Sequence, residues 1–152
     1  MPIRILSIGK KHESWVLEGI ERYEKRLKKP FVCEWVFLPH SAREGVAARQ
    51  EESERILSRL TSNEHVILLD ERGKMLDSPG LSQDLLTHLQ SSRNVTIIIG
   101  GAYGVDATVH QRADVVWSLS DLVFPHQLVR LILTEQLYRA QEIAAGNPYH
   151  HV

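Results

Sequence analysis

The sequence has a single cysteine and no long apolar run. Cys33 has no second cysteine with which to form an internal disulfide, which fits a reducing compartment, and we expect it to be a small core residue in a strand. No apolar stretch approaches the roughly 20 residues of a membrane-spanning helix, so we expect no membrane partner. Residues 1–6 show no basic segment before a long apolar run, and we expect no secretory signal. These features predict a cytoplasmic protein.

An excess of positive charge is also lacking. The formal net charge is -1 at pH 7 and the pI is about 6.7, so the whole molecule has no cationic field that would hold nucleic acid non-specifically. We predict no DNA partner, and any RNA contact has to come from a local patch. One candidate patch contains the basic residues Arg22, Lys25, Arg26, Lys28 and Lys29. The alternative is a solvated helix end whose cations oppose the macrodipole.

Several signatures of known enzyme sites are missing. The sequence contains neither G-x-x-x-x-G-K-[ST] nor G-x-G-x-x-G, which disfavours a loop that grips phosphate. It also lacks a Ser/His/Asp signature, H-E-x-x-H and paired cysteines. The 8 histidines are scattered rather than placed at metal-ligand spacing, so we predict no metal site.

Strand and helix patterns alternate along the chain. Runs rich in β-branched and other apolar residues predict strands over 3–8, 31–38, 65–70, 94–99 and 114–119. Helical spacing predicts helices over 13–28, 42–60, 106–112 and 125–145, with another that follows a loop over 71–77 and is capped by Ser78. This alternation predicts one α/β domain over residues 1–152, with three layers and a mostly parallel sheet.

Two stretches late in the chain each lead from an expected strand into a loop. Ile97–Gly104 ends a run of isoleucines in glycines, and Val115–His126 runs into a long helix. Because ligand loops of open α/β sheets lie at such strand ends, the two loops can form one pocket for an adenine-like ring with few charges. The apolar residues that would line it are Leu69, Leu119, Leu122, Val123 and Phe124. The alternative is a tight glycine turn between a strand and a helix.

The last expected helix carries two further features. His126 and Arg130 are four residues apart, which places both on one helix face beside the pocket. Histidine can move a proton near neutral pH and arginine can hold a phosphate or carboxylate, but such a pair can also be structural. The helix is apolar nearly all round, at Leu128, Val129, Leu131, Ile132 and Leu133. It must be covered on two sides, which predicts a homodimer; the alternative is a central helix packed within one chain.

Six short motifs occur in order along the chain. They are Leu68–Asp70 with Gly73 and Lys74 behind it, Ile98–Gly104, Trp117–Ser120, Pro125–Arg130, Glu135–Ala140 and Asn147–His150. Together they resemble the ribosomal RNA large subunit methyltransferase H family, whose members are small bacterial SPOUT-class enzymes. The likeness runs from the first strand to the final residues and is most specific in the last third.

The resemblance implies a fold, a cofactor and a substrate. It implies a trefoil knot in the C-terminal half, although base rates argue against knots, and an obligate homodimer. It further implies that S-adenosylmethionine is the cofactor and that the methyl group goes to N3 of a pseudouridine in 23S rRNA on assembled ribosomes. By motif, the cofactor site would contain Leu69, Gly100, Gly101, Leu119, Ser120, Asp121, Leu122, Val123 and Phe124.

The resemblance also suggests residues that do the chemistry. His126 or His150 would help to remove the N3 proton, Arg130 would position the phosphate or uracil, and Tyr149 would stack on or pack against the target base. Ala102 and Tyr103 replace the Pro-Glu pair of some members, which weakens a catalytic role at that position. His151 and Val152 replace the basic last residue of some relatives, which weakens the expectation that a tail arginine contributes to RNA binding.

Two other functions share parts of this pattern. A small α/β nucleotide-binding enzyme would have the same architecture, but it should show a phosphate-binding glycine fingerprint and an acidic residue after the second strand, where Pro39, His40 and Ser41 stand instead. A non-catalytic ribosome-binding or assembly factor would share the partner and lack a working cofactor pocket.

Overall fold

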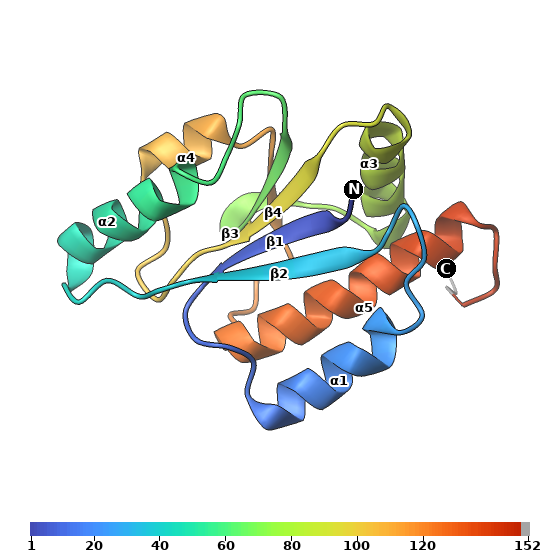
Figure 1. The fold of residues 1–152 in the computed structure, drawn as a ribbon, viewed down its shortest axis with the longest axis horizontal. Coiled ribbons are helices and arrows are strands. Elements are labelled where there is room, and N and C mark those ends of the chain that lie inside the picture. The colour runs from blue at the N-terminus through green and yellow to red at the C-terminus, as the bar shows by residue number, and fades with distance from the viewer. Residues whose placement is uncertain (150–152) are drawn as a thin grey trace.

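The computed structural model describes residues 1–149, and these residues form one five-stranded sheet with helices on both faces (Figure 1). The elements are β1 (Ile3–Ile8), α1 (Ser14–Glu24), β2 (Cys33–Leu38), α2 (Gly45–Leu57), β3 (His65–Met75), α3 (Ser78–Gln90), β4 (Val95–Ile99), α4 (Ala107–Arg112), β5 (Val115–Ser118) and α5 (His126–Ala144).

The strand order across the sheet is β2-β1-β4-β3-β5, and every neighbouring pair is parallel. Parallel strands in the middle of such a sheet are covered on both faces, which is why β1 and β4 read as nearly continuous apolar runs. The predicted α/β class with a parallel sheet is confirmed. The trefoil knot stays a prediction.

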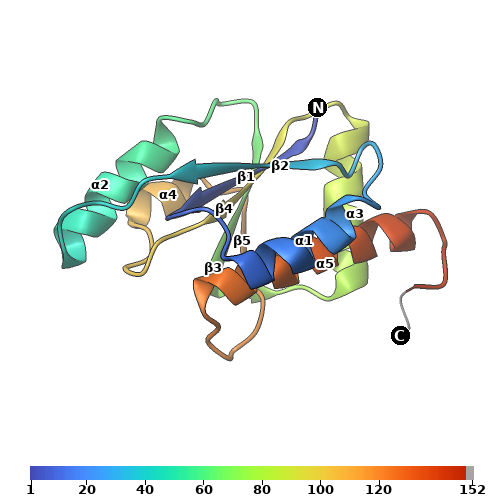
Figure 2. The ribbon, with the colours of Figure 1, turned by 60° about the horizontal axis from the view of Figure 1, so that its bottom comes forward.

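Alternate residues of the strands feed two separate cores. Ile3, Ile5 and Ile97 face a cluster that includes Leu133 and Leu137 of α5. On the other face, the cluster joins residues of four strands to α2 and α4: Leu6, Ile8, Leu38, Val66, Leu68, Ile98, Ile56 and Val109. Figure 2 shows α2 and α4 on one side of the sheet and α1 and α5 on the other. Burying one such aliphatic side chain contributes about 1.5–3 kcal/mol, so the two cores together hold the three layers.

Helix α5 lies between α1 and α3, in contact with both (Figures 1 and 2). The side chain of Leu131 fills the space beside Gly19 of α1, where a Cβ would lie 2.9 Å from it. Leu133, Leu137 and Ala140 face the sheet core. Much of the apolar surface of α5 is therefore covered within one chain. This agrees with the alternative interpretation, in which α5 is a central helix of a single chain. The homodimer stays a prediction.

The prediction of a loop over residues 71–77 is wrong for residues 71–75, because β3 continues to Met75. Lys74 and Met75 pair with Trp117 and Ser118 of β5 after a break in register that follows Leu69. At the break, Gly73 comes so close to β5 that a Cβ would lie 2.4 Å from the backbone oxygen of Val116. The polar residues between the two paired parts conceal this extension from an apolar pattern.

Several predicted ends shift by a few residues. Asp77, and not Ser78, caps α3, since its Oδ1 accepts the N–H of Gly80 at 2.7 Å. Helix α1 ends at Glu24 rather than at residue 28, and α2 spans Gly45–Leu57 rather than 42–60. The other elements lie within about two residues of their predicted bounds.

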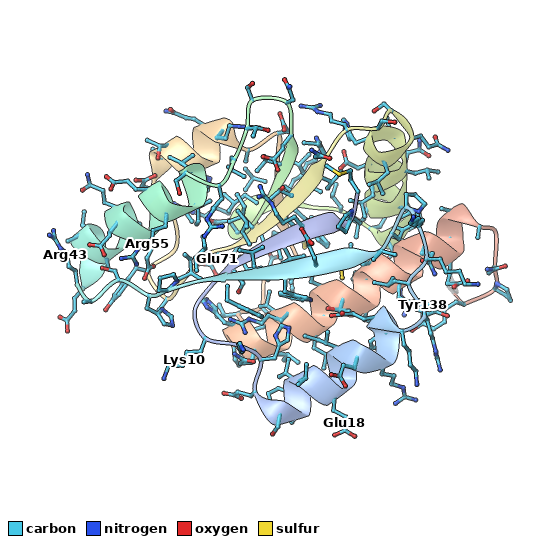
Figure 3. The ribbon with its side chains drawn as sticks, in the orientation of Figure 1. Lys10, Glu18, Arg43, Arg55, Glu71 and Tyr138 are labelled. Atoms are coloured by element: carbon cyan, nitrogen blue, oxygen red, sulfur yellow. The ribbon has the colours of Figure 1, made fainter. Side chains whose placement is uncertain are left out.

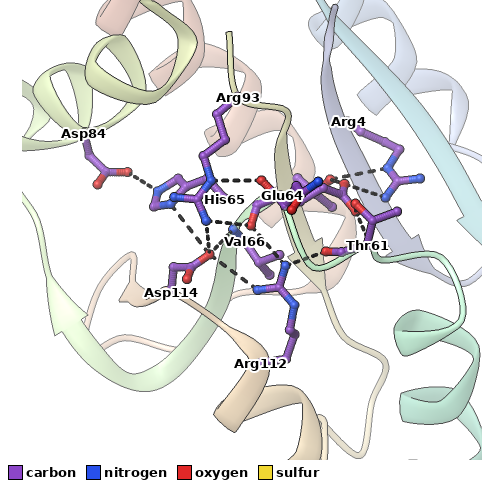
Figure 4. Close-up of polar contacts among 11 residues, drawn as sticks. Arg4, Thr61, Glu64, His65, Val66, Asp84, Arg93, Arg112 and Asp114 are labelled. Carbon is purple, nitrogen blue, oxygen red and sulfur yellow. Dashed lines mark hydrogen bonds and ion pairs between the residues drawn. The ribbon is translucent and has the colours of Figure 1, made fainter. Parts of the chain in front are cut away.

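A network of charged residues closes the edge of the sheet at which β3 begins (Figure 4). Asp114 accepts the backbone N–H of Val66 at 2.8 Å and pairs with Arg93 and Arg112 at 3.8 and 3.5 Å. Nε2 of His65 lies 2.9 Å from Asp84 of α3. These contacts join α3 and the segments before β4 and β5 to the start of β3.

Candidate functional site

The two loops expected to form a pocket leave the sheet at one edge, beside Leu69. Leu69 on β3 pairs with Ile99 on one side and with Trp117 on the other. Because these strands are parallel, Leu69 lies level with the ends of β4 and β5, where the loops after Ile99 and Ser118 leave the sheet, while β3 itself continues to Met75 after a break in register. The structure thus brings the predicted residues Leu69, Gly100, Gly101 and Leu119 to the same edge.

The loop after β4 is held in a tight turn. Gly101 and Gly104 form an isolated antiparallel bridge, in which the N–H of Gly104 donates to the oxygen of Gly101 at 3.0 Å. Gly104 has a φ of +74°, which favours glycine. A Cβ on Gly100 would lie 3.1 Å from Val105, and a Cβ on Gly101 would lie 2.6 Å from Oε1 of Glu52. Gly100 and Gly101 are therefore packed so closely against Val105 and Glu52 that a side chain at either position would meet protein atoms.

The loop after β5 presents apolar side chains to the outside. The hydroxyl of Ser118 donates to the backbone oxygen of Ser120 at 3.0 Å, and the N–H of Leu122 donates to the hydroxyl of Ser120 at 3.0 Å. Leu122 and Val123 are 70% and 81% exposed. Large apolar side chains this exposed at the carboxyl end of a strand are available to cover a flat, weakly charged ring.

Arg130 lies at the same edge but is buried, with 1% of its surface exposed. Its Nη1 donates to the backbone oxygen of Lys10 at 2.8 Å, and its guanidinium lies 5.2 Å from the centre of the Phe37 ring. Figure 3 labels Lys10 in the loop after β1. The structure therefore gives Arg130 a contact with this loop rather than an open position for a phosphate.

His126, one turn before Arg130, is half-buried at the start of α5. Burial, the charge of Arg130 and His40 lower its pKa, and the carboxylate of Glu52 opposes them. His126 is therefore neutral and able to accept a proton near pH 7. Sequence reasoning missed His40 and Glu52, which come from the segment after β2 and from α2; only the three-dimensional fold places them beside His126.

Tyr149 lies at the other end of α5. Its ring contacts Tyr138 edge-on with centres 4.8 Å apart, and the Arg139 guanidinium lies 4.9 Å from its centre. Tyr138 is labelled on the far half of α5 in Figure 3. Tyr138 follows His126 by twelve residues of α5, about 18 Å along the helix, so Tyr149 and His126 do not share a site within one chain. His150 lies outside the described residues.

The basic patch is exposed along and after α1. All five residues of the patch are exposed, namely Arg22, Lys25, Arg26, Lys28 and Lys29. A hollow of about 700 Å³ runs along this helix and is lined by Trp15, Glu18, Gly19, Glu21, Arg22, Lys25 and Arg26. It lies away from the strand ends, so it is not the pocket that the loops were expected to form.

A second group of ionisable residues gathers at the opposite edge. His65, Asp84 and His88 have ligand-type atoms within 4.8 Å of one another. The two imidazole rings are stacked, with centres 3.5 Å apart and planes 15° from parallel. Ring nitrogens donate in the ring plane, so rings stacked in this way do not point at one ion about 2 Å from each. The arrangement is that of an ion-pair network.

Comparisons with other proteins identify relatives of the chain over nearly its full length. A family model described as "Predicted SPOUT methyltransferase" matches residues 1–150. Proteins named ribosomal RNA large subunit methyltransferase H from Francisella philomiragia and Desulfitobacterium hafniense are 38% and 42% identical, over 99% of this chain and 99% of theirs. A protein of the same name from a Synechococcus strain is 44% identical over 97% of this chain and 93% of its own length.

A solved structure shares the fold. The probable methylase family protein from Haemophilus influenzae aligns over 99% of this chain and 70% of its own, with a TM-score of 0.59 and 13% identity. Among helices of the described residues 1–149, none is both long and apolar enough to cross a membrane.

Proposed function

The chain belongs to the SPOUT methyltransferases, in the ribosomal RNA large subunit methyltransferase H family, and from this membership we propose that it methylates ribosomal RNA with S-adenosylmethionine as the methyl donor. The observation that carries the proposal is the identity of 38–42% over 99% of the chain to relatives with that name. The finer substrate that we propose is N3 of a pseudouridine in 23S rRNA, on assembled ribosomes.

The edge at which Leu69 of β3 lies level with the loops after β4 and β5 is the proposed cofactor site. Gly100 and Gly101 carry no side chain and pack closely on Val105 and Glu52, so the loop after β4 offers its backbone there, and Leu122 and Val123 of the loop after β5 are exposed. These features fit a flat, weakly charged ring held by backbone groups. The residues that would hold the cofactor are Leu69, Gly100, Gly101, Leu119, Ser120, Asp121, Leu122, Val123 and Phe124.

The chemistry requires alignment and the removal of one proton. When bound, S-adenosylmethionine supplies a methyl group on a positively charged sulfur. The chain's own residues would then have to align N3 with that methyl group and take up the proton that N3 carries. We assign its removal to His126, which is half-buried and neutral at the site. No metal ion takes part in this scheme.

Arg130 takes a supporting role in this scheme. It is buried and donates to the backbone of the loop after β1, so it fixes the wall of the site on which His126 stands. This differs from the contact with phosphate or uracil expected from the sequence.

In a homodimer, the segment after α5 of one protomer could lie beside the start of α5 in its partner. Within one chain, about 18 Å of helix separates His126 from Tyr138, on which Tyr149 packs. In the proposed homodimer, the C-terminal segment of one protomer can reach the site of its partner, where Tyr149 would pack against the target base. The exposed basic patch on α1 would be doubled in such a dimer and would contact the ribosome, which is the proposed partner in the cytoplasm.

The experiment that tests the function is transfer of a radiolabelled methyl group from S-adenosylmethionine to ribosomes, separate subunits and free 23S rRNA. Label that appears in 23S rRNA of assembled ribosomes, and disappears when Gly101→Leu closes the loop, is the expected result. Absence of label with every RNA, while calorimetry shows cofactor binding, would reject rRNA as substrate. Absence of cofactor binding as well would leave a ribosome-binding factor without catalysis.

A further inference from the structure

Glu52 of α2 is a buried carboxylate at the same edge of the sheet. Its side chain is 3% exposed, and Oε2 accepts the N–H of Ser41 at 2.9 Å and lies 3.9 Å from Nδ1 of His40. Its Oε1 is buried and has no hydrogen-bond donor among the described residues 1–149. A buried acceptor without a donor destabilises the folded state, so this position of Oε1 is energetically unfavourable.

Oε1 lies beneath the glycine loop that follows β4. The space in which Gly101 lacks a Cβ is the space next to Oε1, at 2.6 Å. The adjacent residue Ser53 accepts the backbone N–H of Asp106 at 3.0 Å, where the same loop enters α4. Two consecutive residues of α2 therefore support the two ends of the loop after β4.

Glu52 also lies where the chain changes direction across the sheet. From β1 the chain passes to β2 on one side, and from the neighbouring β4 it passes over β3 to β5 on the other side. In open α/β sheets, ligands bind outside the carboxyl ends of two such strands. The segments after β1, β2 and β4 reach Glu52 or its partner His40 at this point, through Gly9, Ser41 and Gly101.

Three charged or titratable groups on neighbouring elements affect the pKa of His126. Arg130 of α5 and His40 after β2 lower the pKa of His126, in addition to its burial, and Glu52 of α2 is the group that raises it. Removing the charge of Glu52 would remove the one contribution that raises the pKa of His126.

We propose that Glu52 is a positioning residue for methyl transfer, which holds the glycine loop from beneath through Gly101 and keeps a negative charge beside His126. This inference rests on the proposed function. Glu52 does not touch the ligand, because Gly101 covers its free oxygen; it acts through the loop and through His126.

The test is Glu52→Gln, which keeps the shape and one oxygen for Ser41 and removes the charge. We expect kcat for methyl transfer to fall by about tenfold or more, with the KM for ribosomes unchanged. We also expect the midpoint of the His126 ring titration, followed by NMR, to move to lower pH. A purely structural role for Glu52 would not produce this shift.

The matched control is Glu51→Gln on the same helix. Glu51 pairs with Arg43 and Arg55, 3.4 Å from Arg43, and Figure 3 shows both arginines at the α2 end of the molecule. This variant should keep the wild-type kcat and the wild-type His126 titration.

A second pair of variants covers the case in which Glu52→Gln does not fold. Gly101→Ala places a methyl group against Oε1 and should lower kcat, and Glu52→Asp, whose carboxylate is one methylene shorter, should restore part of it in the double variant. An unchanged His126 midpoint in Glu52→Gln, an unchanged kcat, or no rescue of Gly101→Ala overturns the proposal. If the wild type methylates no RNA, the proposed function fails, while the His126 midpoint still decides whether Glu52 controls that residue.

Discussion

Arg4 and Glu64 form an ion pair across the amino edge of the sheet, with Nη2 of Arg4 2.8 Å from Oε1 of Glu64 (Figure 4). Glu64 is nearly buried, and it also accepts the N–H of Thr61 at 2.6 Å. Burial by itself raises the pKa of Glu64, but hydrogen bonds from Thr96 and Thr61 and the charge of Arg4 outweigh burial and lower the pKa.

We therefore expect Glu64→Gln to reduce the free energy of unfolding by about 1.5–3 kcal/mol at pH 7. Because the folded pKa is lowered, the stabilisation is complete above the ordinary value of 4.5 and is lost as the pH falls through the lower folded value. Urea unfolding at pH 7 and at pH 3 measures this. The exposed Glu54→Gln on α2 is the control and should match the wild type at both pH values.

Gly73→Ala should be strongly destabilising. A Cβ at this position would lie 2.4 Å from the backbone oxygen of Val116, which cannot move without breaking the pairing of β3 with β5. We expect a loss of more than about 2 kcal/mol in urea unfolding. Gly146→Ala, at a φ of +74° with open space around it, should cost only about 1 kcal/mol. Equal losses in the two variants would contradict the close approach of Gly73 to β5.

His12 should stay neutral far into the acid range. Burial and the charge of Arg130 lower its pKa to about 4, and its ring packs edge-on against Trp35 and Phe37. The unfolded chain then binds a proton at higher pH than the folded chain does, so stability should fall as the pH drops from about 6.5 toward 4. NMR titration should give a midpoint near 4 for this ring, and His12→Gln should flatten the decline of stability in that range. A midpoint near 6.5 would show that the ring is not enclosed.

His126→Ala tests the proposed proton acceptor. A general base typically contributes a factor of about 10²–10⁴, so kcat should fall by that amount while the KM for ribosomes changes little. His150→Ala, outside the described residues, should be assayed beside it. Wild-type rates in both variants at saturating ribosomes would mean that neither histidine takes the proton.

Charge reversal at Lys25, Arg26 and Lys29 should weaken binding to ribosomes. Each phosphate contact that is lost should also reduce the slope of log affinity against log salt by about 0.7–0.9. Filter binding over a range of salt concentrations measures both effects. Arg49→Glu on α2 is the control, and it should bind as the wild type does.

The sequence predicts the order and type of the elements because buried parallel strands have simple patterns. β4 is entirely buried and appears as an unbroken run of β-branched residues. The extension of β3 is not predictable in this way, since Glu71, Arg72 and Lys74 belong to a polar margin of the sheet. Its cause is the contact of Gly73 with β5, which depends on a strand more than 40 residues later in the chain.

The candidate site was only partly predictable for the same reason. Gly100, Gly101 and His126 stand out because each lies at the end or the start of a regular element. In the sequence, Glu52 is one of several acidic residues of a charged helix and is not distinguished from its exposed neighbours. Only the fold buries it next to Gly101. The burial of Arg130 is equally invisible in the sequence, because helical spacing gives the direction of a side chain and not what covers it.

The loop after β4 is fastened at both ends and open at its tip. Gly101 rests on Glu52 and Asp106 is tied to Ser53, whereas Ala102 and Tyr103 between them are exposed. Replacing or lengthening the tip would change the surface of the proposed site without disturbing the sheet. Positions 102 and 103 can therefore be randomised to seek altered RNA preference while Gly101, Glu52, Ser53 and Asp106 are left unchanged.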